Sequence, residues 1–378
     1  MIHKLFPRAA FALAACCSSA LLGAPAAQAA DFSAEYVFGD SLSDRGNIAE
    51  LENVLNFQMH GFFLGNFPNP PSNHDSFTNG PVAVQLLAQS LGLNANPSLW
   101  LTGFKDPAGL FPGFVPGTNY AVGGATAAFD PQGGIAGINL PQQVAAYSAF
   151  VSDHADPDAL YVVMIGGNDV RNAALQGTGV DAVTNGVGTE LTEIASLADE
   201  GARHFLIVNV PNVGLIPEFA QDNPTLAADA TTFSQLYDTD LAQGLAALDP
   251  TLAAGTTLTD FDLYGLNAGI LANAAAHELT NTTDRCFTNT PFSAAATPQC
   301  SPDGANVDSF AYWDDIHPTQ PVQALWAQGF EGAVPEPSTW AMLLVGFVGL
   351  GFWAPGAARR LARRREPIKI SSAGGRPR

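Results

Sequence analysis

Short apolar runs recur along this chain, and each stops at a glycine, a proline or a polar residue. Such runs occupy residues 36–38, 159–165 and 204–210, and a β-rich run occupies residues 256–261. Helical patterns lie between and after them, at residues 81–91, 140–151, 182–200, 225–248, 263–278 and 318–330. Apolar strands that alternate with helices are typical of a parallel sheet with helices on both faces. The sequence therefore predicts one three-layer α/β domain with a central parallel sheet.

The N-terminal residues predict an export signal. Lys4 and Arg8 precede a mostly apolar stretch at residues 9–22, and Ala27-Gln-Ala29 has the small residues that a signal peptidase accepts. We expect a signal peptide at residues 1–29 and the folded domain at residues 30–330. The alternative is a lipoprotein cleavage site before Cys16, although the apolar run in front of it is short.

The C-terminal residues predict a membrane or sorting segment. Pro335-Glu-Pro337 is followed by the apolar run 341–353 and by five arginines between residues 359 and 365. A run this short is at the lower limit for a transmembrane helix, and the arginines would stay on the cytoplasmic side. We expect a linker at residues 331–337, the apolar segment within residues 338–365, and a basic tail at residues 366–378.

The charge distribution excludes nucleic acid as a partner. Residues 30–356 contain 34 acidic and only 5 basic side chains, a formal charge of −29. The basic residues are spread along the chain, so no basic patch exists to bind a phosphate backbone.

Cysteine usage agrees with export. Cys16 and Cys17 lie in the predicted signal, which leaves Cys286 and Cys300 as one pair in the mature chain. This pair predicts a disulfide that closes the loop between them. A metal site is disfavoured, because two cysteines at this spacing without a nearby histidine pair match no common zinc pattern.

Four polar sites fall where strands or turns end. They are Asp40-Ser41, Gly123-Gly124 after a strand end at residues 118–122, Asn168-Asp169, and Asp314 to His317. Ester hydrolysis needs a nucleophile, a base, a group that orients the base, and donors for the oxyanion. Together, the four sites supply all of these parts. Taken alone, Ser41 is equally well explained as a helix cap.

An Asp-x-x-His turn suits an orienting acid and a general base. The Asp314 carboxylate can accept from Nδ1 of His317, which leaves Nε2 to deprotonate Ser41. Asp315 is the competing orienting acid, and the spacing favours Asp314. The N–H groups of Ser41 and Gly124 and the amide of Asn168 can donate to the oxyanion. Asp40 and Asp44 have two interpretations, turn hydrogen bonding or a cation site, and we favour the first.

These blocks closely resemble the GDSL or SGNH hydrolases. Gly39-Asp-Ser41-Leu, Gly124, Asn168 and Asp314-x-x-His317 match the four family blocks in order, and residues 77–82, Phe-Thr-Asn-Gly-Pro-Val, resemble a stretch of longer members. The resemblance implies a flavodoxin-like α/β/α fold and a serine esterase that uses no cofactor or metal. It assigns Ser41, Asp314 and His317 to catalysis and Ser41, Gly124 and Asn168 to the oxyanion hole. Where longer relatives often have a basic residue, this chain has Ser76.

The C-terminal order of Pro-Glu-Pro, apolar run and arginines resembles the PEP-CTERM sorting signal of Gram-negative bacteria. The resemblance implies recognition by an exosortase, removal of the segment, and a surface or extracellular protein held only transiently in the inner membrane. A permanent membrane anchor is the alternative. The 13 residues after the arginines depart from the usual pattern, in which the signal stops near them.

The sequence is compatible with more than one class of substrate. We expect an exported esterase or lipase that acts on carboxylic esters, and the alternatives are an O-acetylesterase of extracellular polysaccharide or a non-catalytic surface protein. Phenylalanines at positions 57, 62, 63 and 67 lie in a predicted loop at residues 57–77. They suit either an acyl pocket or lid, or packing of the loop onto the domain.

Overall fold

The computed structural model describes residues 32–49, 76–98, 117–129, 138–290, 293–301 and 305–334. The residues from Asp31 to Val334 form one compact unit. The predicted signal peptide, most of the 57–77 loop, the apolar run at 341–353 and the basic tail lie outside the described residues. No helix within the described ranges is long and apolar enough to cross a membrane.

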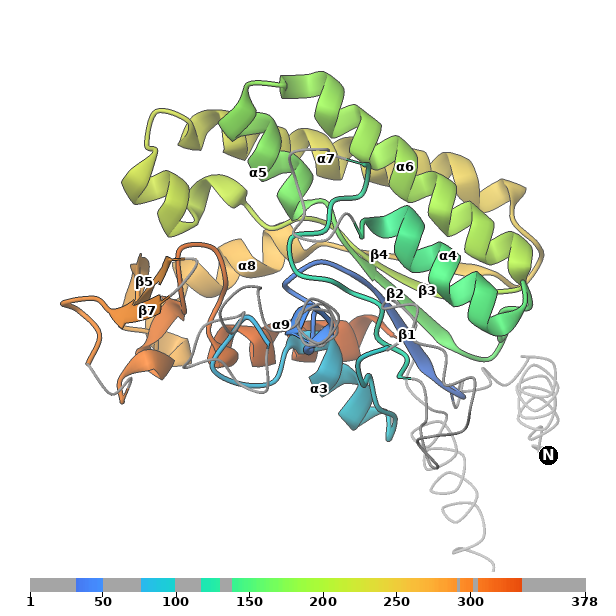
Figure 1. Cartoon of the computed structure of the whole chain (residues 1–378), viewed down its shortest axis with the longest axis horizontal. Helices are drawn as coiled ribbons and strands as arrows, with labels where there is room; N and C mark the ends of the chain where they lie inside the picture. Colours follow the sequence, from blue (N-terminus) through green and yellow to red (C-terminus); the bar gives the residue numbers. More distant parts are fainter. Residues whose placement is uncertain are drawn as a thin grey trace, which may run out of the picture. The chain divides into compact units, whose positions relative to one another are not determined.

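Four parallel strands form the central sheet, in the order β1-β2-β3-β4 (Figure 1). They are β1 (Glu35–Gly39), β2 (Leu160–Met164), β3 (His204–Val208) and β4 (Thr257–Phe261). Strand β2 is buried along its whole length, because it has a strand on each edge and helices on both faces. Strand β4 pairs on one edge only and stays partly exposed, which agrees with its more polar sequence.

An extended segment at residues 118–122 continues the sheet beyond β1. The N–H of Val37 donates to the carbonyl of Thr118 (3.0 Å), and Val37 accepts in turn from the N–H of Tyr120 (2.7 Å). Counted in chain order with this segment, the sheet reads 2-1-3-4-5, which is the flavodoxin-like order. The winding direction reverses between β1 and β2. In such sheets, ligands bind at the carboxyl ends of the strands that flank this reversal.

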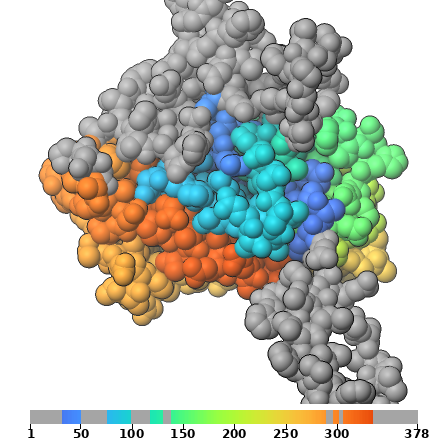
Figure 2. Space-filling model, turned by 90° about the horizontal axis from the view of Figure 1, so that it is seen from below, coloured from blue at the N-terminus to red at the C-terminus, as the bar shows by residue number. Residues whose placement is uncertain are grey.

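Helices cover both faces of the sheet (Figure 1). One layer holds α4 (Leu140–Val151), α5 (Gly167–Gln176), α6 (Gly179–Glu200) and α7 (Ala227–Leu248), and the other holds α3 (Ala83–Ser90), α8 (Leu263–Ala272) and α9 (Gln320–Ala333). Helices α3 and α9 lie side by side in the second layer (Figure 2). Helix α6 shows why these segments pack: its buried residues recur every three or four positions, at 183, 187, 190, 194 and 197.

Short elements complete the described part of the chain. Strand β5 (Asn281–Arg285) pairs in parallel with β8 (Phe310–Tyr312), and β6 (Phe287–Thr290) pairs antiparallel with β7 (Ser293–Ala296). A disulfide joins Cys286 to Cys300. Short helical segments are η2 (Val213–Leu215), η3 (Glu218–Asp222), η4 (Asp249–Thr251), η5 (Ala274–His277) and η6 (Val307–Ser309).

The three-layer α/β architecture expected from the sequence is confirmed, and the predicted disulfide is present. The helix predicted at residues 140–151 has those bounds. The helix predicted at residues 263–278 is divided into α8 and η5, because the chain turns at Asn273. Sequence patterns missed α5, and they missed the short strands in the segment that was expected to be a loop around Cys286.

Candidate active site

The Ser41 turn begins where β1 ends at Gly39. The carboxamide of Gln143 on α4 accepts from the N–H of Gly39 (2.9 Å) and donates to its carbonyl (2.8 Å). A Cβ at Gly39 would lie 2.5 Å from the carbonyl oxygen of Met164, so only glycine fits between β1 and β2. Asp40 closes the turn by accepting from the N–H of Leu42 (2.9 Å). These contacts place Ser41, which is buried, at the reversal point of the sheet.

His317, near the C-terminal end of the compact unit in the sequence, contacts Ser41, near its N-terminal end. Its Nε2 lies 2.7 Å from the Ser41 Oγ, and its Nδ1 lies 2.9 Å from both carboxylate oxygens of Asp314. The carboxylate of Asp315 instead forms an ion pair with Arg285. The geometry therefore brings together Ser41, His317 and Asp314, and it leaves Asp315 outside this chain of contacts.

The Asp314 carboxylate is held in its charged form. Burial alone would raise its pKa, but the imidazole of His317 and the N–H groups of His317 and Ile316 outweigh burial, so that the pKa lies below its usual value. The two N–H groups donate to the same oxygen at 2.7 and 2.9 Å. A fixed, ionised carboxylate can orient an imidazole and stabilise the imidazolium.

Asn168 stands at the start of α5, directly after β2. Its Nδ2 donates to the carbonyl of Ala125 (2.9 Å), which fixes the plane of the amide. An amide nitrogen carries two hydrogens, so one donor remains. The next residue, Asp169, accepts from the N–H groups of Ala127 and Ala128 and ties the same loop to α5. Asn168 and Ser41 line one cavity.

Gly124 lies in the turn that follows the extended segment beside β1. Its backbone is left-handed (φ +79°), a conformation that favours glycine. The carboxylate of Asp44 holds the preceding residue, Gly123, by accepting from its N–H at 2.8 Å. Asp44 thus connects the segment after Ser41 to the Gly124 turn.

Both carboxylates after β1 accept from backbone N–H groups, in agreement with the interpretation as turn hydrogen bonds. Asp44 also accepts from the N–H groups of Gly46, Asn47 and Ile48. Its burial raises its pKa to about 7 in spite of these four donors, and burial raises the pKa of Asp40 to about 6. Among the described residues, no group of three or more His, Cys, Asp or Glu side chains could hold a metal ion.

A mostly apolar cavity opens beside Ser41. Its volume within the described residues is about 50 Å³. The segments that follow β1 and β3, helices α5, α8 and α9 and the chain around His317 contribute its walls. The apolar side chains in these walls include Leu42, Val213, Ile216, Leu271, Val322 and Trp326. Arg171 also reaches the cavity, but its guanidinium is paired with Glu218. A cavity of this kind suits an apolar group rather than an anionic one.

Sequence reasoning did not find Gln143 or the role of Phe77. The Phe77 ring packs on the imidazole of His317, with the ring centroids 4.9 Å apart. A Cβ on Gly123 would collide with the same ring. Gln143 had a detectable signal, because it is a polar residue on the face of α4 that carries Leu140, Val144 and Tyr147. The position of Phe77 depends on tertiary packing and has no such local signal.

Comparison with known proteins identifies the family. The sequence model of the family described as GDSL-like Lipase/Acylhydrolase matches residues 36–330. A GDSL esterase/lipase of Arabidopsis thaliana is 30% identical over 279 residues, which are 67% of this chain and 73% of the relative. Lipase 1 of Photorhabdus luminescens is 32% identical over 189 residues, 49% of this chain and 23% of that protein.

Solved structures to which the chain was matched include a catalytic mutant of an acetylxylan esterase from Geobacillus stearothermophilus. It is 13% identical, with a TM-score of 0.39, over 81% of this chain and 95% of that one. At the other end of the chain, the PEP-CTERM protein-sorting motif matches residues 333–365 and implies export and processing by an exosortase. The chain therefore belongs to the GDSL-like lipase/acylhydrolase family of serine hydrolases and carries a PEP-CTERM sorting motif.

Proposed function

We propose that this protein is an exported esterase that hydrolyses carboxylic esters through an acyl intermediate on Ser41. The observation that carries the proposal is the continuous contact from Ser41 Oγ through the His317 imidazole to the buried Asp314 carboxylate. The family match supports it. No cofactor or metal enters the mechanism.

Acylation begins with attack of Ser41 Oγ on the ester carbonyl carbon. The hydroxyl proton passes to Nε2 of His317, and the ionised Asp314 stabilises the resulting imidazolium. The tetrahedral oxyanion accepts hydrogen bonds from the N–H groups of Ser41 and Gly124 and from the remaining amide hydrogen of Asn168. One such donor contributes about 3 kcal/mol of transition-state stabilisation. Collapse of the intermediate breaks the bond to the alcohol oxygen, which takes the proton from His317.

Deacylation repeats these steps with water as the nucleophile. His317 accepts a proton from water, which attacks the acyl carbon, and Ser41 leaves with a proton from His317. The products are the carboxylic acid and the free enzyme.

The cavity supports a second, narrower candidate function, in which the substrate carries a short acyl group. Its volume of about 50 Å³ is small beside the ~300–1,000 Å³ of pockets that bury drug-sized ligands. An acetyl group fits such a space, so O-acetylesterase activity on an extracellular polysaccharide is the alternative to a lipase that acts on long acyl chains. The apolar walls suit the acyl side of the ester.

The proposal includes the cellular setting. Residues 1–29 direct export, residues 30–330 form the hydrolase, and residues 331–337 link it to the sorting segment 338–365 and the basic tail 366–378. The protein reaches the surface or exterior of a Gram-negative cell, with the apolar run holding it in the inner membrane until an exosortase acts. The match to the PEP-CTERM sorting motif supports this setting.

The test is hydrolysis of p-nitrophenyl acetate, butyrate and palmitate by the purified protein and by its Ser41→Ala variant. We expect turnover in the wild-type protein and none in the variant, with the circular dichroism spectrum unchanged. Turnover of acetate alone would select the O-acetylesterase, to be checked on an acetylated glycan, and turnover of palmitate would select the lipase. Retained turnover in a folded Ser41→Ala protein would refute the assignment.

A further inference from the structure

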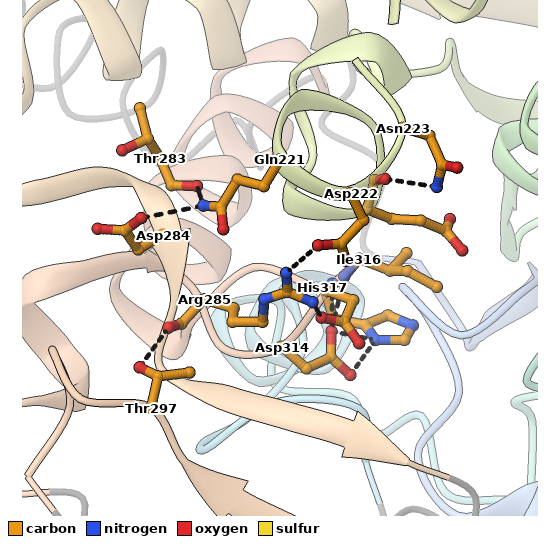
Figure 3. A network of polar contacts seen from close by, with 12 residues as sticks. Gln221, Asp222, Asn223, Thr283, Asp284, Arg285, Thr297, Asp314, Ile316 and His317 are labelled. Carbon is orange, nitrogen blue, oxygen red and sulfur yellow. Dashed lines mark hydrogen bonds and ion pairs between the residues drawn. The ribbon is translucent and has the colours of Figure 1, made fainter. Parts of the chain in front are cut away.

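Arg285 braces the turn that carries His317 from outside the active site. The arginine ends β5, and its guanidinium contacts the carboxylate of Asp315. It also contacts the carboxylate of Asp222 at 2.7 Å (Figure 3). Asp315 lies between Asp314 and His317 in the chain. A contact on its side chain therefore constrains the backbone on both sides of it.

The backbone that follows Arg285 forms hydrogen bonds with β8 and with the start of the same turn. The N–H of Cys286 donates to the carbonyl of Tyr312 (3.1 Å), and the N–H of Phe287 donates to that of Trp313 (2.9 Å). Trp313 donates in turn to the carbonyl of His317 (2.8 Å). These hydrogen bonds hold β5 and the residues after it against β8 and the turn. They do not include residue 315, which Arg285 contacts through its side chain.

A second segment, η3, also holds the turn. The N–H of Glu218 on η3 donates to the carbonyl of Asp315 (3.0 Å), and the carboxylate of Glu218 is paired with Arg171 on α5. Because Asp222 at the end of η3 also contacts Arg285, the arginine connects η3 to β5. Residue 315 is therefore held at its carbonyl by η3 and at its side chain by Arg285.

The two contacts of Arg285 differ in exposure. The side chains of Arg285 and Asp315 are 15% and 21% exposed, whereas that of Asp222 is 48% exposed. Exposed ion pairs are screened by water and contribute little, while the shielded pair is stronger. Residues 30–356 contain only 5 basic side chains against 34 acidic ones, so few cations are available to replace this one. Without it, the Asp315 carboxylate would be left beside Asp314 with no opposite charge.

We propose that Arg285 is a positioning residue for the hydrolysis reaction, which acts through its ion pair with Asp315 to hold the Asp314–His317 turn in register with Ser41. The inference rests on the proposed function. It concerns the geometry of the base and not the binding of the ester, because neither Arg285 nor Asp315 lines the cavity beside Ser41.

The test is a double-mutant cycle of Arg285→Gln and Asp315→Asn, measured as kcat and KM on the best p-nitrophenyl ester. We expect each single variant to lose about tenfold or more in kcat, since small misplacements of catalytic groups have large effects, with KM changed less than about twofold. The double variant should be no slower than the slower single variant, because both changes remove one interaction. Arg285→Lys should recover part of kcat.

Asp222→Asn is the matched control, since it removes the exposed contact of Arg285 and spares Asp315. We expect its kcat within about twofold of wild type. Thermal unfolding of every variant shows that the compared proteins are folded, and Asp315→Asn and Asp222→Asn provide the comparison if Arg285→Gln fails to fold.

Two results would overturn the positioning role while leaving the proposed function intact. They are a wild-type kcat in folded Asp315→Asn, and losses in the two single variants that multiply in the double variant. Labelling of Ser41 by a fluorophosphonate separates the two claims. A wild-type protein that neither turns over an ester nor becomes labelled would overturn the proposed function, and this inference with it.

Discussion

At the scale of residues, single buried polar side chains fix the backbone near Ser41. The amide of Gln143 forms hydrogen bonds with both the N–H and the carbonyl of Gly39. The carboxylate of Asp44 accepts hydrogen bonds from four N–H groups in two separate segments. Each side chain arrives from a different part of the chain. Buried polar groups with full hydrogen bonding specify one geometry, because any shift would leave a donor or an acceptor unpaired.

Asn168 provides the prediction at this scale. We expect Asn168→Ala to lower kcat by about 10²- to 10³-fold, because the proposed mechanism then loses one oxyanion donor and keeps the N–H groups of Ser41 and Gly124. KM should change little. Steady-state kinetics on a p-nitrophenyl ester measures both, with Asn172→Ala, one turn later on α5, as the control. An equal loss in the control would indicate a general disturbance of α5 instead.

At the scale of elements, the part of the chain around the disulfide supports the turn that carries His317. Strand β5 pairs with β8, and β8 runs directly into that turn. Cys286 follows β5 without a gap, and both cysteines are buried. The disulfide therefore secures the strand that the turn depends on.

Removing the disulfide tests this arrangement. We expect the double variant Cys286→Ala and Cys300→Ala to lose about 3 kcal/mol of unfolding free energy, the value for a closed loop of ~15 residues. The backbone of Cys286 and Phe287 is hydrogen-bonded to Tyr312 and Trp313, just before the turn that carries His317, so losing the disulfide that secures this segment should lower kcat as well. Chemical denaturation and ester kinetics measure the two effects, and an unchanged denaturation midpoint would contradict the prediction.

Sequence patterns predicted the elements that contain continuous apolar runs and missed those that depend on distant partners. Strand β2 is apolar throughout and was evident. Helix α5 follows Gly166, whose left-handed backbone (φ +104°) starts it, and its first residues read as the end of a strand. Strand β5 is made of polar residues and exists because β8 pairs with it.

The candidate site shows the same division. The spacing of Asp314 and His317 predicted their contact, since three residues suffice for a local turn. The position of Asp315 depends on Arg285, 30 residues earlier in the chain, and no local pattern reveals that pair. The packing of Phe77 on the imidazole likewise connects segments that are far apart in the sequence.

At the scale of the whole molecule, the domain buries carboxyl groups while carrying a large negative charge. Burial raises the pKa of Asp169 to about 7, and that of Glu190 and Asp238 to about 8. Glu190 accepts from the hydroxyl of Tyr237 (2.6 Å) deep in the helical layer of α6 and α7. The folded state therefore binds more protons than the unfolded chain at mildly acidic pH.

This proton binding predicts the pH dependence of stability. A carboxyl group whose folded-state pKa is raised contributes most below its unfolded pKa of about 4, and that contribution is lost as the pH rises through 7 to 8. Self-repulsion of the acidic domain acts in the same direction. We expect the melting temperature to fall between pH 5 and pH 8, and Glu190→Gln to reduce the slope. Asp314 has a lowered pKa and would weaken the fold only at lower pH. A melting temperature that rises over this range would contradict the prediction.

Ser41 and His317 are 276 residues apart in the chain, and this separation determines when the contact between their side chains can form. A chain delivered from its N-terminus, by a ribosome or through an export channel, presents Ser41 early and His317 close to the end of the compact unit. The contact between the two side chains can form only after nearly all of that unit has emerged. Under the proposed function, a chain that is still emerging cannot hydrolyse esters, because its nucleophile and its base are not yet in contact.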